Sequence, residues 1–250
     1  MEKYYDIFGM RVDTTSFKDA SLKILKWAIE DEPRYVCVAN VQMVMESYDD
    51  TNFMKIVNEA DLVTPDGMPL VWFLRYSGVK NQKRVDGPTL MPQICQMAAQ
   101  EKIPVGFLGS TPFVNEQLVK NVQRMFPDLP IVYACSPPFH ELSPDENKSI
   151  TDGINRSGAK ILFVGLGCPK QERWMASQKN KVSTVMIGIG AAFEIYARTK
   201  KRAPFWMQRA GLEWMYRFIQ EPKRMGKKYL KNNPRFLILM GLTMIKSRLR

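Results

Sequence analysis

The sequence has one histidine, no closely spaced cysteines and no long hydrophobic run, and each absence excludes a class of protein. Because His140 is the only histidine, a histidine-rich metal site is excluded, and a hydrolase triad would have to be built on this one imidazole. The four cysteines form no CxxC pair, which favours buried, reduced thiols. The start of the chain lacks the apolar stretch of a secretory signal, and Phe236–Ile245 has about half of the roughly 20 apolar residues that a spanning helix needs. These absences predict a cytoplasmic protein whose contact with a membrane is peripheral.

Two ligand-binding motifs are also missing. No Asp-x-Asp pair occurs in the chain, which disfavours a divalent metal holding a nucleotide diphosphate, although scattered carboxylates could still bind one. Gly165-Leu-Gly167 and Gly188-Ile-Gly190 each follow an apolar run, but neither completes the GxGxxG fingerprint of dinucleotide binding. Tight turns without a ligand explain these glycines equally well. We therefore predict neither a metal nor a cofactor.

Short apolar runs rich in β-branched residues recur along the first four-fifths of the chain, and amphipathic stretches such as 41–59 and 89–101 lie between them. This alternation predicts an α/β fold, with a Rossmann-like, mostly parallel sheet flanked by helices. Such sheets bind ligands at the carboxyl ends of their strands. The apolar runs are residues 35–40, 60–67, 104–110, 130–138, 160–167 and 184–190.

The positive charge is concentrated in the last fifth of the chain. Residues 198–250 hold fifteen Lys or Arg, only two acidic residues and seven aromatic residues, and subtracting their net +13 from the +11 of the whole chain leaves about −2 for residues 1–197. We therefore divide the chain into an α/β core, 1–197, and a basic amphipathic helical appendage, 198–250. Basic helices with interfacial aromatics lie on anionic membranes. An ordinary solvated helix is the other interpretation, and the many apolar side chains argue against nucleic acid.

Two polar motifs lie where a site is expected. Thr64-Pro-Asp66-Gly67 puts a carboxylate at a strand end, where it could act as a general base if its surroundings raise its pKa, although a turn or helix-capping role would also explain it. Arg84 suits phosphate, while Gln171 and Glu172 suit sugar hydroxyls, although a solvated helix end explains the last pair almost as well.

Taken in order, several segments resemble the WecG/TagA/CpsF family of bacterial glycosyltransferases, also called glycosyltransferase family 26. The resemblance implies an inverting transfer of a hexose from a UDP-sugar to a polyprenyl-diphosphate-linked sugar on the inner face of the membrane. The products would be lipid-linked intermediates of teichoic acid, enterobacterial common antigen or exopolysaccharide. The segments are ADLVTPDGMPLVW (60–72), RVDG (84–87), SPPF (136–139), VGLGCPKQERWM (164–175), GIGAAFE (188–194) and the long run from Arg202 to Leu230.

The resemblance also assigns roles to residues. It implies Asp66 as the catalytic base, with Arg217 and Arg224 as the residues that neutralise charge on the departing UDP. The appendage would cover the active site and hold the enzyme to the membrane. Three positions depart from the family pattern, because Val38 replaces a threonine and Glu194 and Arg198 replace an aspartate and a glycine. The residues expected to bind substrate are Asn40, Gly67, Arg84, Gly109, Gly167, Pro169, Gln171, Glu172, Gly190 and Arg202.

The leading hypothesis is a metal-independent UDP-hexosyltransferase on an anionic membrane surface, with N-acetylmannosamine as the sugar and lipid-linked GlcNAc as the acceptor. Transfer of glucose or of N-acetylmannosaminuronic acid is the nearest alternative. A nucleotide-binding α/β oxidoreductase and a non-enzymatic basic membrane adaptor are rivals from other classes. The oligomeric state is open and includes a homo-oligomer.

Overall fold

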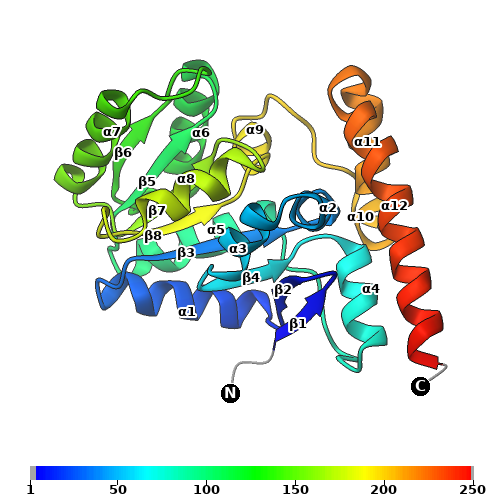
Figure 1. Cartoon of the computed structure of the whole chain (residues 1–250). Helices are drawn as coiled ribbons and strands as arrows, with labels where there is room; N and C mark the ends of the chain where they lie inside the picture. The colour runs from blue at the N-terminus through cyan, green and yellow to red at the C-terminus, as the bar shows by residue number, and fades with distance from the viewer. Residues whose placement is uncertain (1–3, 249–250) are drawn as a thin grey trace.

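Six parallel strands form the centre of the molecule. The computed structural model describes residues 4–248, apart from the side chains of residues 224, 225, 227, 228 and 246–248. The strands lie in the order β4-β3-β8-β7-β5-β6 (Figure 1). The predicted class, a parallel α/β sheet flanked by helices, is confirmed. The strands are β3 (Arg34–Ala39), β4 (Leu62–Pro65), β5 (Val105–Gly109), β6 (Ile131–Cys135), β7 (Ile161–Gly165) and β8 (Val185–Gly188), and β1 (Tyr4–Ile7) and β2 (Met10–Asp13) pair as a separate antiparallel hairpin.

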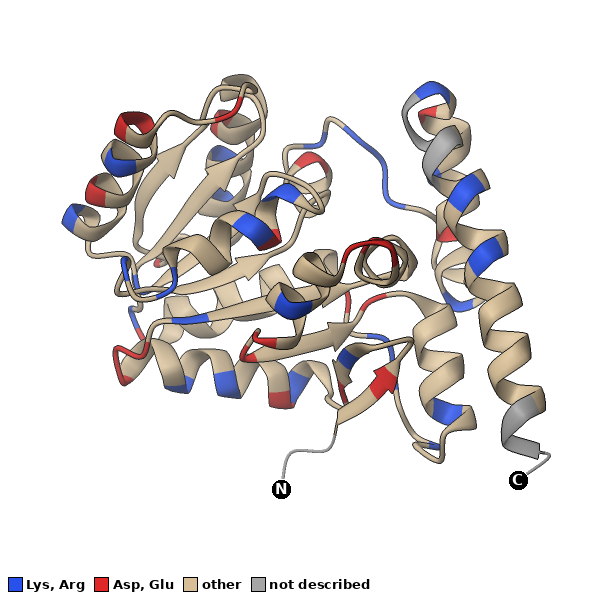
Figure 2. Cartoon of the chain, in the orientation of Figure 1, with Lys and Arg blue, Asp and Glu red and all other residues tan. Residues whose placement is uncertain are grey.

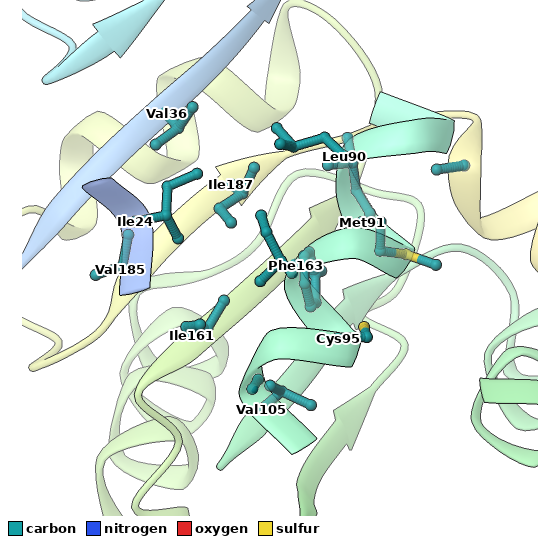
Figure 3. Close-up of a cluster of buried hydrophobic side chains, with 14 of the residues drawn as sticks. Ile24, Val36, Leu90, Met91, Cys95, Val105, Ile161, Phe163, Val185 and Ile187 are labelled. Atoms are coloured by element: carbon teal, nitrogen blue, oxygen red, sulfur yellow. The ribbon is translucent and has the colours of Figure 1, made fainter. Parts of the chain in front are cut away.

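Helices cover both faces of the sheet because alternate strand residues point to opposite sides. Val36 and Val38 of β3 pack with α1, α5 and α6, in the cluster that Figure 3 shows, whereas Cys37 packs with α2, α3 and α8 on the other face. The helices of the core are α1 (Phe17–Ile29), α2 (Val41–Asp49), α3 (Thr51–Asn58), α4 (Met68–Tyr76), α5 (Gly87–Gln100), α6 (Pro112–Met125), α7 (Pro144–Ser157), α8 (Lys170–Gln178) and α9 (Ala192–Tyr196).

Capping side chains decide where several helices begin. The stretch 41–59, predicted as one amphipathic unit, is two helices, because the side chain of Asp50 accepts hydrogen bonds from the backbone N–H groups of Asn52 and Phe53 and starts α3. The helix expected from residue 89 starts at Gly87, where Asp86 is the N-cap. Both caps are aspartates that sequence periodicity alone does not mark.

The chain reverses its winding direction between β5 and β7. The connection from β5 through α6 leads outward to β6, while the connection from β7 through α8 leads the other way to β8. The helices that follow these neighbouring strands pack on opposite faces, which is the arrangement at which open α/β sheets bind ligands. Gly109 lines this point with φ +130°, and a Cβ there would lie 2.6 Å from the carbonyl of Gly165. Only glycine permits this approach of two strand ends.

The appendage is helical and packs along one side of the core (Figure 1). Arg235 of α12 forms a bidentate ion pair with Asp49 of α2, at 2.8 and 2.5 Å. Phe236 is fully buried and meets the ring of Phe8 edge-on at 5.4 Å, within the same hydrophobic cluster as the core residues. The domain boundary at 197/198 stays a prediction. The appendage helices are α10 (Phe205–Arg209), α11 (Glu213–Gln220) and α12 (Pro222–Arg248).

Candidate active site

The carboxyl edge of the sheet gathers the predicted site residues. Asn40 follows β3 and caps α2 through its side-chain oxygen, which accepts from the N–H of Met43 at 3.2 Å. Asp66 follows β4, and its N–H donates to the carbonyl of Ala39 at 2.8 Å. Gly67 comes next as the N-cap of α4, and a Cβ on Gly67 would lie 3.6 Å from the Cα of Asn40. The ends of β3 and β4 therefore form one continuous surface.

Asp66 is held by Arg84. The Nε and Nη2 atoms of Arg84 donate to Oδ1 of Asp66 at 3.0 and 2.8 Å, and Nε also donates to the Asp66 carbonyl. Both side-chain bonds reach the same carboxylate oxygen. These two bonds fix the orientation of the Asp66 carboxylate relative to the guanidinium of Arg84.

Arg84 and Asp66 belong to a larger ion-pair network that joins the core to the appendage. Nη1 of Arg84 lies 2.7 Å from Oε2 of Glu213, and Nη2 of Arg217 lies 2.7 Å from Oε1 of the same carboxylate. Nη2 of Arg202 lies 2.7 Å from Oδ1 of Asp86, the N-cap of α5. Three arginines thus face three carboxylates, so the network is balanced in charge. Its members are Asp66, Arg84, Asp86, Arg202, Glu213 and Arg217.

Burial makes Asp66 a better base than an ordinary aspartate. Loss of solvent raises its pKa to about 6, and the repulsion of Asp86 and Glu213 adds to the rise, while Arg84 and Arg217 oppose it. A carboxylate of pKa about 6 is mostly ionised at neutral pH and can still hold a proton that it removes from a hydroxyl. The pKa shift expected for a general base is therefore present at Asp66.

The side chains of Gln171 and Glu172 hold the loop that precedes α8 in place. Oε1 of Gln171 accepts from the N–H of Gly167 at 3.1 Å, and Nε2 of Gln171 donates to Oε1 of Glu172 at 2.7 Å. Glu172 is fully buried, and burial raises its pKa to about 7, against the hydrogen bonds of Gln171 and Cys168. Gln171 therefore contacts the loop directly, whereas Glu172 is buried on the inner side of Gln171 and hydrogen-bonds to it.

The same loop is joined to the neighbouring strand ends. The Cys168–Pro169 peptide bond is cis, and the carbonyl of Cys168 accepts from Nε2 of Gln42 on α2 at 3.2 Å. A Cβ on Gly190 would lie 3.7 Å from Oε1 of Gln171, so the end of β8 packs directly on this side chain. The ends of β7 and β8 thus meet at Gln171, and α2 contacts the same loop through Gln42.

A small cavity of about 50 Å³ lies beside the ion-pair network, between α9, the segment 198–203 and α11. Lys200 lines this cavity, and its Nζ lies 2.5 Å from Oε1 of Glu194 and 2.9 Å from Oε2 of Glu221. Arg198 stands where the resembling family has glycine, and it adopts the left-handed conformation with φ +59°. The chain therefore keeps the glycine-like backbone at this bend. Glu194, the second departure, pairs with the lysine of the linking segment.

Comparison of the chain with models of known protein families identifies its family. The model described as "Glycosyl transferase WecG/TagA/CpsF family" matches residues 5–250, almost the whole chain. The chain belongs to this family of glycosyltransferases. The match includes both the sheet edge that carries Asp66 and the appendage that carries Arg217, so the ion-pair network lies entirely within the family's own domain.

Named relatives of this glycosyltransferase come from Staphylococcus aureus. Proteins of strains MW2, NCTC 8325 / PS 47 and MRSA252 are each 27% identical over 235 residues, covering 93% of this chain and 90% of the relative. Each of these relatives is named N-acetylglucosaminyldiphosphoundecaprenol N-acetyl-beta-D-mannosaminyltransferase. The names specify a lipid diphosphate acceptor for those proteins.

The structure of this glycosyltransferase also shows residues that the sequence analysis missed. Glu213 and Asp86 are central to the ion-pair network, and neither was named as a site residue. Glu213 is one of only two acidic residues in the appendage, which was the available signal. The side chain of Arg224 lies outside the described residues, so its predicted role stays a prediction. Within the described part of the chain, no three His, Cys, Asp or Glu side chains converge as metal ligands.

Proposed function

We propose that this protein is an inverting glycosyltransferase that moves N-acetylmannosamine from its UDP derivative to GlcNAc linked to polyprenyl diphosphate. The observation that carries the proposal is the Asp66 carboxylate, which lies at the carboxyl edge of the sheet, has a pKa of about 6 and is held through Oδ1 by Arg84. The names of the staphylococcal relatives support the choice of sugar and acceptor.

In the proposed reaction, Oδ2 of Asp66 accepts the proton of the acceptor hydroxyl as its oxygen attacks the anomeric carbon of the donor. The new C–O bond forms while the bond to the β-phosphate oxygen of UDP breaks on the opposite side, which inverts the configuration. Arg84 holds the base in place and Arg217 stabilises the negative charge on the departing diphosphate. The arginines would do the work that a divalent metal does in enzymes with an Asp-x-Asp motif.

The appendage fits a peripheral contact with the anionic inner face of the cell membrane. Figure 2 shows Lys and Arg on the segment that leads into the appendage and on α12, where residues 236–245 carry no charged side chain. Exposed apolar side chains gather on these helices, and each basic residue near an anionic membrane contributes about 1 kcal/mol. No helix in the described part of the chain is long and apolar enough to cross a bilayer. The exposed side chains are Phe205, Trp206, Trp214, Ile219, Leu230, Leu237, Ile238, Leu242 and Ile245.

The proposal is tested by measuring UDP release from UDP-N-acetylmannosamine, UDP-N-acetylmannosaminuronic acid and UDP-glucose, with EDTA and a short-chain polyprenyl-diphosphate GlcNAc. We expect release from UDP-N-acetylmannosamine only when the acceptor is present. Release from one of the other donors would replace the sugar and keep the reaction class. A requirement for added Mg²⁺ or Mn²⁺ would overturn the assignment of charge neutralisation to the arginines. Release from no donor, across several lipid acceptors, would contradict the proposed reaction.

A further inference from the structure

The Glu213 carboxylate lies between two arginines that come from different parts of the chain. Its Oε2 is 2.7 Å from Nη1 of Arg84, which belongs to the core, and its Oε1 is 2.7 Å from Nη2 of Arg217 on its own helix. Only 8% of Glu213 is exposed. Burial by itself would raise the pKa of Glu213, but Arg217 and Arg84 together lower it below its ordinary value, so the carboxylate is charged at neutral pH.

A buried charge is a costly way to attach a helix. Replacing a buried ion pair by well-packed apolar residues is often neutral or stabilising, so the attachment of α11 does not by itself require a carboxylate here. Glu213 and Arg217 are four residues apart on one helix face, which holds the Arg217 guanidinium on the same carboxylate that pairs with Arg84. A carboxylate at this position therefore orders two cations at the site at the same time.

The negative charge of Glu213 also acts on the proposed base. The charged groups that face Asp66 are Arg84 from the segment before α5, Asp86 at the start of α5, and Glu213 and Arg217 from α11. Without Glu213, Asp66 would face two arginines and one carboxylate. The repulsion between Glu213 and Asp66 would be lost, and the positive charges of Arg84 and Arg217 would be less neutralised. Both changes favour the ionised form of Asp66, which lowers its pKa and makes it a weaker base.

We propose that Glu213 is a positioning residue for the transfer reaction, whose carboxylate holds the guanidinium groups of Arg84 and Arg217 in place and adds its own negative charge to those that face Asp66. This inference rests on the proposed function. It gives the appendage a part in the chemistry besides covering the site. Docking of α11 brings both a cation for the diphosphate and a carboxylate that adjusts the base.

The test compares the pH profiles of kcat/KM for the full-length wild-type protein and Glu213→Gln, with lipid acceptor present. Glutamine keeps the size and an acceptor oxygen but removes the charge. We expect the acidic limb of the profile to move to lower pH and kcat to fall about tenfold, because a weaker base transfers the proton less readily. A purely structural role for Glu213 would lower the amount of active enzyme and leave the limb in place.

Two further variants serve as controls. Glu221→Gln removes a carboxylate that pairs with Lys200 at 2.9 Å in the same appendage but is not among the groups that face Asp66, so its acidic limb should match the wild type. Glu213→Asp keeps the charge, so its limb should lie near that of the wild type even if kcat falls. It also remains informative if Glu213→Gln does not fold.

The outcomes separate the inference from the proposed function. If the wild type shows no acceptor-dependent transfer, the proposed function has failed before the variants are compared. If the wild type transfers sugar and Glu213→Gln keeps the wild-type limb, the inference is overturned and the proposed function stands. An equal shift in Glu213→Asp and Glu213→Gln would also overturn it, because the charge would then not be the cause.

Discussion

Glu172 should make the stability of this protein depend on pH, and replacing it with glutamine isolates the effect. The side chain is fully buried behind Gln171, and burial raises its pKa from 4.5 to about 7. Between these two values the folded protein holds a proton that the unfolded chain has released. The free energy of unfolding therefore falls as pH rises from about 4.5 to about 7 and then levels off.

The size of the effect follows from the same two values. One pKa unit corresponds to about 1.4 kcal/mol, so the full span costs about 3 kcal/mol, and about 2 to 3 kcal/mol of it falls between pH 5 and pH 8. Glu172→Gln cannot ionise, and its amide oxygen can still accept from Gln171. The variant should therefore gain about 2 to 3 kcal/mol relative to the wild type when the pH is raised from 5 to 8. Asp66 also titrates in this range, but it does so in both proteins and cancels in the difference.

Urea unfolding of both proteins at pH 5, 6.5 and 8 measures the difference directly, provided that the dependence on urea is the same in both. Glu116→Gln is the matched control, because 60% of the Glu116 side chain is exposed and surface changes usually stay within about 0.5 kcal/mol. A stability difference between wild type and Glu172→Gln that stays constant from pH 5 to pH 8 would refute the reasoning. It would mean that Glu172 stays ionised in the folded protein.

Two packing predictions can be checked with the same unfolding assay. Phe236→Ala should destabilise the attachment of α12 by about 3 to 5 kcal/mol, because the ring is fully buried against Phe8. Leu237 is 55% exposed, so Leu237→Ala should change the free energy of unfolding by less than about 1 kcal/mol. Equal effects of the two substitutions would show that α12 is not packed as described. Gly109→Ala should destabilise the core by more than about 2 kcal/mol, since its Cβ would lie 2.6 Å from the carbonyl of Gly165 at φ +130°, and an unchanged urea midpoint would contradict that geometry.

The fold could be predicted from sequence because its signals are local. Each buried strand is a short β-branched run that ends in a small or turn-forming residue, and the carboxyl edge of a parallel sheet follows from the alternation with helices. This pattern predicts that Asp66 and Gly167 lie at the carboxyl edge of the sheet, where β4 and β7 end. The two helices within residues 41–59 were not separated, because the capping role of Asp50 is invisible to hydrophobic periodicity.

The ion-pair network could not be predicted in the same way, because its members meet only through tertiary structure. Arg84 was named as a phosphate ligand, yet in the structure its guanidinium holds Asp66 and Glu213. Glu213 is 147 positions from Asp66, so no spacing rule connects the two residues. Glu172 was grouped with Gln171 as a sugar ligand, and only its complete burial shows that it lies behind that side chain. Ion pairs between residues that lie far apart in the sequence leave no pattern from which they could be predicted.

Whether Asp66 is the base is tested by acceptor-dependent UDP release, measured for the wild type and for Asp66→Asn at the same concentration of folded protein. Asparagine keeps the shape of the side chain and an oxygen for Arg84 but cannot take up the proton. We expect release to fall at least about a hundredfold in the variant, and wild-type release to decline as pH drops below about 6, where Asp66 becomes protonated. Comparable release by Asp66→Asn, or a wild-type rate that does not change between pH 5 and pH 8, would contradict the assignment of Asp66 as the base.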